Sequence, residues 1–246
     1  MSTFVLVPGF WLGAWAWEAV AAPLREAGHA VYPVTLTGLA ERAGEGGPEV
    51  DLETHVADLV ELITGADLRE VVLVAHSGAG APVTGAADRV AERIRRVVYL
   101  DSGPLRDGAA ALDSYPPEQR ERTEAALLDG WRLPLPSWAE LAAAGSSLAG
   151  LDEAQLALFR ERATDQPAGP LRQPLRLSGA VDGLAKTLVS CSFPLEQVRA
   201  LIAAGHPWFA DLGGPRWDLT ELTTGHWPMF SRPADTARVL AEVAAG

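Results

Sequence analysis

An apolar run that ends in a serine among very small residues most constrains how this chain can fold. Residues 71–75 are Val-Val-Leu-Val-Ala, and residues 76–80 are His-Ser-Gly-Ala-Gly. This pattern indicates a buried parallel strand, a sharp turn at Ser77 and then a helix. The spacing is that of Gly-x-Ser-x-Gly, with alanine at 75 and 79. Small residues are needed there because such a turn brings strand and helix backbones close together. The alternative is an ordinary strand-to-helix turn without a reactive serine.

A histidine far downstream completes the pattern. Residues 216–222 are predicted to form the last strand, and His226 follows on a loop before a final helix over 234–244. Loops at the carboxyl ends of parallel strands share one edge of a sheet, so we expect Ser77 and His226 to meet there. A lone histidine is more often an ordinary loop residue. However, a serine after an early strand and a histidine after the last strand is the chain order of one known fold.

Strand and helix patterns alternate along most of the chain. Strands are expected near residues 3–8, 29–34, 70–76, 96–101, 186–191 and 216–222, with helices near 15–27, 52–64, 78–92 and 194–204. Alternation of this kind predicts a parallel sheet with helices on both faces. Residues 104–180 interrupt it with short helical pieces and no strand signal. We therefore expect a single domain with a core of 1–103 and 181–246 and a small helical cap at about 104–180.

The motifs resemble those of the α/β-hydrolase superfamily, in particular the branch of plant methyl esterases, hydroxynitrile lyases and their bacterial relatives. The resemblance covers nearly the whole chain and is clearest in residues 4–103 and 186–240. It rests on residues 4–17, 24–31 and 36–39, on the serine turn at 75–80, here called the elbow, and on His226, Pro228, Ser231 and Pro233. Pro8-Gly9 stands where the family usually has His-Gly. The resemblance implies an α/β-hydrolase fold and a Ser-His-Asp triad.

The acid of that triad departs from the usual pattern. The family's aspartate follows the penultimate strand, here 186–191, but residues 192–198 contain no aspartate. Asp101 ends the strand that follows the elbow helix, and some members of the fold carry the acid there. We expect Asp101 to orient His226. The alternatives are that Asp101 only binds loop amides, or that Glu196 is the acid. Asp182 precedes its strand and Asp218 lies within one.

These positions predict a mechanism. A serine hydroxyl is a weak nucleophile until a histidine takes its proton, and a carboxylate orients that histidine. Ser77 would be the nucleophile, His226 the base and Asp101 the acid. Two backbone amides, from Phe10 and Gly78, are expected to form the oxyanion hole.

Aromatic side chains predict an apolar substrate pocket. We expect Trp11, Trp131, Trp138, Phe193 and Trp227 to line it, for a small or medium apolar substrate with one reactive polar group. The alternative for the cap residues among them is a small core within the cap itself. The five histidines show no metal-ligand spacing, and no phosphate-binding loop is visible. We therefore expect neither a metal nor another cofactor.

Charge and composition restrict the classes of binding partner and the location that we expect. A formal net charge of −12 argues against nucleic acid and anionic membranes as partners. No apolar run approaches the ~20 residues of a membrane span, the start lacks a signal-peptide pattern, and Cys191 is the only cysteine. We expect a cytoplasmic monomer or homodimer that acts on a small molecule.

The predicted function is hydrolysis of an ester, thioester or lactone by an activated serine. Two alternatives use the same pocket. One is a lyase or cyclase, in which His226 would act as acid and base on a bound hydroxyl. The other is a non-catalytic small-molecule binder, which would tolerate the loss of Ser77.

Overall fold

A six-stranded parallel sheet forms the centre of the structure, a computed structural model that describes residues 1–246. Its strands are β1 (Thr3–Val7), β2 (Ala30–Pro33), β3 (Val71–His76), β4 (Ile94–Leu100), β7 (Ala185–Ser190) and β8 (Trp217–Glu221). The order across the sheet is β2-β1-β3-β4-β7-β8, and every pairing is parallel. All six predicted strands are confirmed. The strand that precedes Ser77 is therefore central, and β4 and β7 end beside each other.

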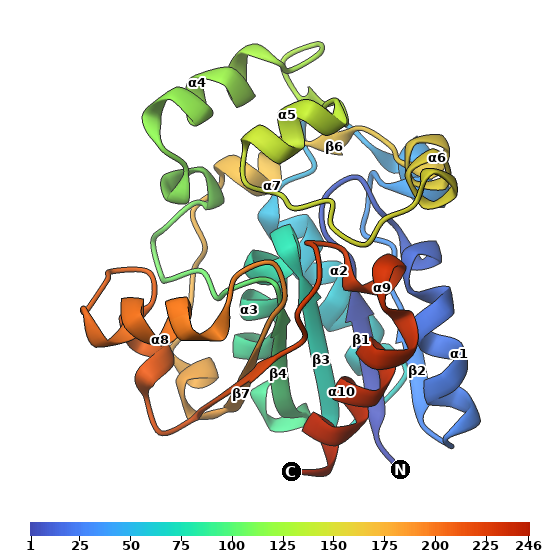
Figure 1. Ribbon diagram of the computed structural model, residues 1–246, viewed down its shortest axis with the longest axis vertical. Coiled ribbons are helices and arrows are strands. Elements are labelled where there is room, and N and C mark those ends of the chain that lie inside the picture. Colours follow the sequence, from blue (N-terminus) through green and yellow to red (C-terminus); the bar gives the residue numbers. More distant parts are fainter.

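Helices cover both faces of the sheet because successive strand residues point to opposite sides. In β1, Phe4 and Leu6 join one apolar cluster while Val5 and Val7 join the other. The first face is covered by α1 (Glu18–Glu26) and α10 (Pro233–Ala245), and the second by α2 (Leu52–Gly65), α3 (Gly80–Arg89) and α8 (Leu195–Ala203). Figure 1 shows α1 and α10 side by side. No helix is both long enough and apolar enough to cross a membrane.

Side-chain caps fix where several helices begin. The Asp51 carboxylate accepts a hydrogen bond from the Thr54 backbone N–H at 2.9 Å, which confirms the predicted start of α2. Ser137 and Glu140 form a capping box at the start of α5 (Trp138–Ala143). Such caps satisfy backbone N–H groups that the first turn of a helix leaves unpaired.

Residues 104–180 lie over the carboxyl ends of the strands (Figure 1). Besides α5, this segment contains α4 (Pro117–Ala125), α6 (Glu153–Arg162), α7 (Gly169–Arg172), β5 (Arg132–Leu133) and β6 (Gln166–Pro167). The expectation of a strand-free segment is wrong, because β5 and β6 form an antiparallel pair. Two residues per strand are too few to show a period-2 pattern, and the proline in β6 further conceals it.

This segment contributes Leu105, Leu141, Phe159 and Leu175 to the main core, and Phe159 links it to the histidine loop. Phe159, on α6, is fully buried, with its ring centroid 5.3 Å from Trp227 and 5.6 Å from Phe230. Trp227 directly precedes the short helix α9 (Pro228–Ser231), which follows His226, and Phe230 lies within it. The segment is thus anchored to the loop that carries the histidine.

Candidate active site

Ser77 occupies a strained turn between β3 and α3. Its φ is 52°, in the left-handed region that non-glycine residues rarely adopt. The turn depends on small neighbours: Ala75 and Ala79 are buried, and a Cβ on Gly80 would overlap the backbone carbonyl oxygen of Gly103. The Ser102 hydroxyl donates a hydrogen bond to the Ser77 carbonyl at 2.5 Å and holds the turn from the β4 side.

Three strand ends bring Ser77, His226 and Asp101 into one hydrogen-bonded chain. Ser77 Oγ lies 2.7 Å from His226 Nε2, and His226 Nδ1 lies 2.6 Å from Asp101 Oδ2. A carboxylate only accepts hydrogen bonds, so neutral His226 carries its proton on Nδ1 and presents Nε2 as an acceptor to the serine hydroxyl. This is the arrangement in which an imidazole can take a proton from a serine.

Asp101 is held by four donors. Its Oδ1 accepts from the backbone N–H groups of Cys191 and Ser192, both at 2.9 Å, and its Oδ2 accepts from the Ser192 hydroxyl at 2.6 Å as well as from His226. Burial disfavours the ionised carboxyl, but the bonds from His226 and Ser192 outweigh burial and hold the pKa of Asp101 below its usual value. Asp101 therefore contacts loop amides and His226 at once. No ring nitrogen of His226 is left for Glu196.

His76 links two loops of the site, a role that was not predicted from the sequence. Its Nε2 donates to the His226 carbonyl oxygen at 2.7 Å, and its Nδ1 accepts from the Gly9 N–H at 3.3 Å. The ring is fully buried, and burial, together with the nearby His226, lowers the pKa of His76 to about 3. A neutral imidazole is thus fixed between them. The available signal was its place directly before the elbow serine.

Phe10 and Gly78 lie in contact beside the elbow. A Cβ added to Gly78 would overlap the Phe10 ring, so only glycine fits there while the ring keeps its position. The Phe10 N–H donates no hydrogen bond within the chain. It therefore remains available to an oxygen atom bound near Ser77.

The five aromatic residues expected in one pocket lie in different surroundings. Trp227 is buried, edge-on to His226, with ring centroids 4.9 Å apart. Trp138 packs on Phe159 and beneath the Arg160 guanidinium.

The other three also have separate surroundings. Trp11 donates from Nε1 to the Leu133 carbonyl at 3.0 Å, and Trp131 packs beneath the Arg132 guanidinium. Phe193 is 50% exposed on the loop after β7. Among the five, Trp227 is the one whose ring packs against the His226 ring.

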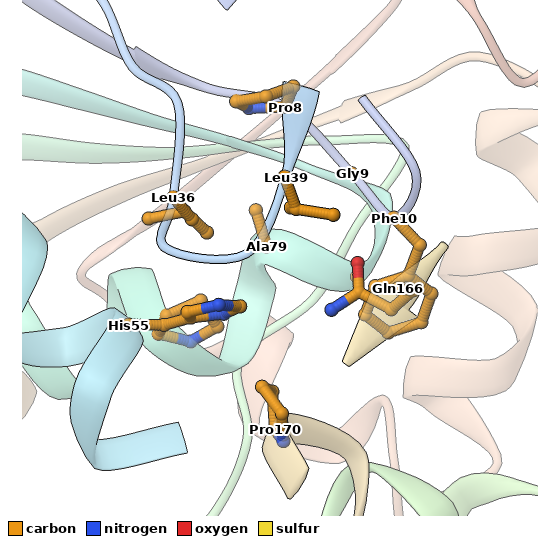
Figure 2. Close-up of a pocket in the computed structure, with 11 residues that line it drawn as sticks. Pro8, Gly9, Phe10, Leu36, Leu39, His55, Ala79, Gln166 and Pro170 are labelled. Atoms are coloured by element: carbon orange, nitrogen blue, oxygen red, sulfur yellow. The ribbon is translucent and has the colours of Figure 1, made fainter. Parts of the chain in front are cut away.

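A small cavity adjoins the elbow, and His226 is not among the residues that line it (Figure 2). Its volume is about 10 Å³, room for one water-sized group. It lies between the loop after β1, α2, the start of α3 and the β6–α7 segment, and is lined by Pro8, Gly9, Phe10, Leu36, Leu39, His55, Gly78, Ala79, Pro82, Gln166 and Pro170. No group of three or more His, Cys, Asp or Glu side chains is placed to hold a metal ion.

Comparison with known proteins decides the family. The family model described as "Alpha/beta hydrolase family" matches residues 4–239. The chain is also 32% identical to the "Carbendazim hydrolyzing esterase" of Nocardioides sp. (strain SG-4G), over 98% of this chain and 99% of that protein. The chain belongs to the α/β-hydrolase family. This α/β-hydrolase is an enzyme of the esterase type, which confirms the predicted fold class and enzyme class.

Two further relatives agree with this family. The "Putative methylesterase 12, chloroplastic" of Arabidopsis thaliana is 34% identical, but over 47% of this chain and 33% of its own length. An extracellular alpha/beta-hydrolase from Paenibacillus species superposes with a TM-score of 0.82 at 24% identity, with 98% of both chains covered. At that identity the likeness shows the fold. The predicted resemblance to the methyl-esterase branch is confirmed.

Proposed function

We propose that this α/β-hydrolase is a cofactor-free serine hydrolase that cleaves an ester, thioester or lactone of a small apolar substrate through Ser77, His226 and Asp101. The observation that carries the proposal is the unbroken hydrogen-bonded chain of 2.7 and 2.6 Å between the serine, the histidine and the carboxylate. A non-catalytic binding protein has no need of a serine in a strained turn, nor of a histidine oriented to accept the proton of its hydroxyl.

The proton moves twice in each half of the reaction. As Ser77 Oγ attacks the substrate carbonyl carbon, its proton passes to His226 Nε2. His226 then returns that proton to the leaving alcohol or thiol as the C–O or C–S bond breaks. A water molecule then attacks the acyl-serine and gives a proton to His226. His226 passes this proton to Ser77 Oγ as the acid product leaves.

Two further groups stabilise charge during these steps. Asp101 stays ionised, because its hydrogen bonds keep its pKa low, and it stabilises the imidazolium form of His226. The N–H groups of Phe10 and Gly78 would hold the oxyanion, and in other enzymes one such donor contributes about 10²–10³-fold in kcat. Trp227 shields one side of His226 from water, since its ring is buried against the imidazole.

Fluorophosphonate labelling followed by intact-mass measurement tests the activated serine. We expect a single adduct on the wild type and none on Ser77→Ala or His226→Ala. Ser114→Ala is a matched control, because Ser114 is exposed and its hydroxyl donates to the Ala111 carbonyl rather than to a histidine. A folded wild type without an adduct would contradict the proposal and favour a lyase, a cyclase or a non-catalytic binder.

Substrates follow from the same comparison. We propose to test carbendazim first, because the full-length relative is named for hydrolysing it, beside methyl esters, thioesters and lactones of increasing size. Turnover that disappears in Ser77→Ala supports hydrolysis. A cytoplasmic location and a monomeric or homodimeric state stay predictions, the latter measurable by light scattering.

A further inference from the structure

The cavity beside the elbow lies where the acyl part of a substrate would be held. It is lined by Phe10 and Gly78, the two residues whose amides would bind the carbonyl oxygen, but not by His226. The leaving group has to lie next to His226, because that residue donates a proton to it. A space that adjoins the oxyanion residues without adjoining His226 is therefore on the acyl side of the scissile bond.

His55 supplies an unused hydrogen-bond acceptor at this cavity. The side chain lies on the first turn of α2 and is 2% exposed, and its Nε2 lies 2.9 Å from the Thr37 carbonyl oxygen. A carbonyl accepts only, so Nε2 carries the proton and Nδ1 holds a lone pair. Nδ1 makes no hydrogen bond within the chain. Burial lowers the pKa of His55, so the ring stays neutral and keeps this lone pair.

Gln166 supplies a donor on the opposite wall. It lies on β6 and is 1% exposed. Its Oε1 accepts from the Trp11 backbone N–H at 3.4 Å, and its Nε2 donates to the Pro167 carbonyl at 3.2 Å. An amide nitrogen has two hydrogens, so one remains for another partner. Figure 2 shows the His55 ring projecting from α2 toward the cavity, with the Gln166 amide facing it from the other side.

Size and polarity together define what fits. The cavity of about 10 Å³ admits one water-sized group. Buried polar atoms that face such a space favour a polar occupant, because leaving them unpaired is costly. A hydroxyl satisfies both walls, since it can donate to His55 Nδ1 and accept from Gln166 Nε2. An N–H satisfies His55 alone.

We infer that this cavity is an acyl-side subsite that binds a small hydrogen-bond donor next to the substrate carbonyl. The donor is a hydroxyl group on the adjacent carbon or the N–H of an adjacent nitrogen. The inference rests on the proposed function and adds the acyl class: acids with a small polar substituent beside the carbonyl. A methyl group of equal size would leave both polar walls unpaired and would be rejected.

A matched substrate pair tests this subsite. Aryl hydroxyacetates and aryl propanoates differ in whether a hydroxyl or a methyl group occupies the relevant position. We expect the wild type to favour the hydroxyacetate in kcat/KM, relative to the uncatalysed rates. His55→Leu and Gln166→Met should each reduce this preference about three- to tenfold, the equivalent of one hydrogen bond. His206→Leu is the control, because His206 lies in the turn after α8 and does not line the cavity.

Fluorophosphonate labelling of every variant separates the two proposals. Suppose that the wild type and the variants are labelled equally. The subsite is then refuted, and the serine mechanism stands, if the wild type does not prefer the hydroxyacetate or if both variants keep that preference unchanged. An unlabelled wild type refutes the mechanism itself. Should His55→Leu fail to fold, the wild-type preference and Gln166→Met still decide, because Gln166 lies on the opposite wall. A cavity that holds only water would show no preference.

Discussion

Replacing Asp101 with asparagine should disable catalysis by reversing one hydrogen bond. The surroundings fix how the new amide would lie. The backbone N–H groups of Cys191 and Ser192 both point at Oδ1, so the amide oxygen has to take that position. The amide nitrogen then takes the position of Oδ2 and presents a donor to His226 Nδ1.

This reversal changes the tautomer of the histidine. To accept from the asparagine, His226 has to lose its proton from Nδ1 and carry it on Nε2, where it faces Ser77 Oγ. A protonated Nε2 cannot accept the serine proton, so the base is lost. In a Ser-His-Asp triad the same change lowers kcat on the order of 10⁴-fold. We expect a loss of that size here, because all three side chains keep their places.

The assay is steady-state hydrolysis of an activated ester, with circular dichroism and urea unfolding to verify the fold. Asp218→Asn is the matched control, since this carboxylate lies on β8, is 69% exposed and is paired with Arg96. Glu196→Gln tests the other acid considered from the sequence. If Asp101→Asn retains more than a tenth of wild-type kcat, or if Glu196→Gln is inactive, the assignment of the acid is wrong.

Three further predictions concern the oxyanion residues, the core and acid stability. Gly78→Ala would press a methyl group on the Phe10 ring, so we expect kcat to fall about 100-fold while the protein stays folded. Phe159→Ala would empty a fully buried site beside Trp227 and should lower the free energy of unfolding by about 3–5 kcal/mol in urea titrations. Burial lowers the pKa of His76 to about 3 in the folded protein, while the unfolded ring binds a proton below about pH 6.5. The free energy of unfolding should therefore fall as pH drops from 6.5 to 4.5, and it should fall less in His76→Gln.

Each of these has a clear contrary result. An active Gly78→Ala enzyme would mean that the Phe10 ring moves without displacing its amide. A small effect of Phe159→Ala would show that the segment over the sheet is energetically separate from the core. A pH slope unchanged by His76→Gln would mean that other groups cause the acid sensitivity, among them His55, whose pKa is also lowered by burial.

Local sequence was sufficient for the sheet and for the chain order of the site. Strand β3 is buried on both faces, so its sequence is a continuous apolar run, and the very small residues after it indicated the turn. Ser77 and His226 follow strands of one parallel sheet, and that topology alone brings their loops to one edge. The candidate acid could also be named, because β4 and β7 are neighbours in any such sheet.

Packing decided what the pattern left open. Whether Asp101 or Glu196 reaches the histidine depends on loop amides 90 residues away in the chain, which no local pattern reports. The linking role of His76 required two loops to close on one ring.

The aromatic residues show the same limit. Their hydrophobicity predicts burial but not the neighbour against which each is buried, so Trp138 and Trp227 pack beside Phe159 and the cavity is lined by other residues. Hydrophobic burial has no direction, and steric fit among distant segments chooses the partners. Sequence therefore determined the scaffold and its catalytic edge, and only the tertiary structure decided the contacts around that edge.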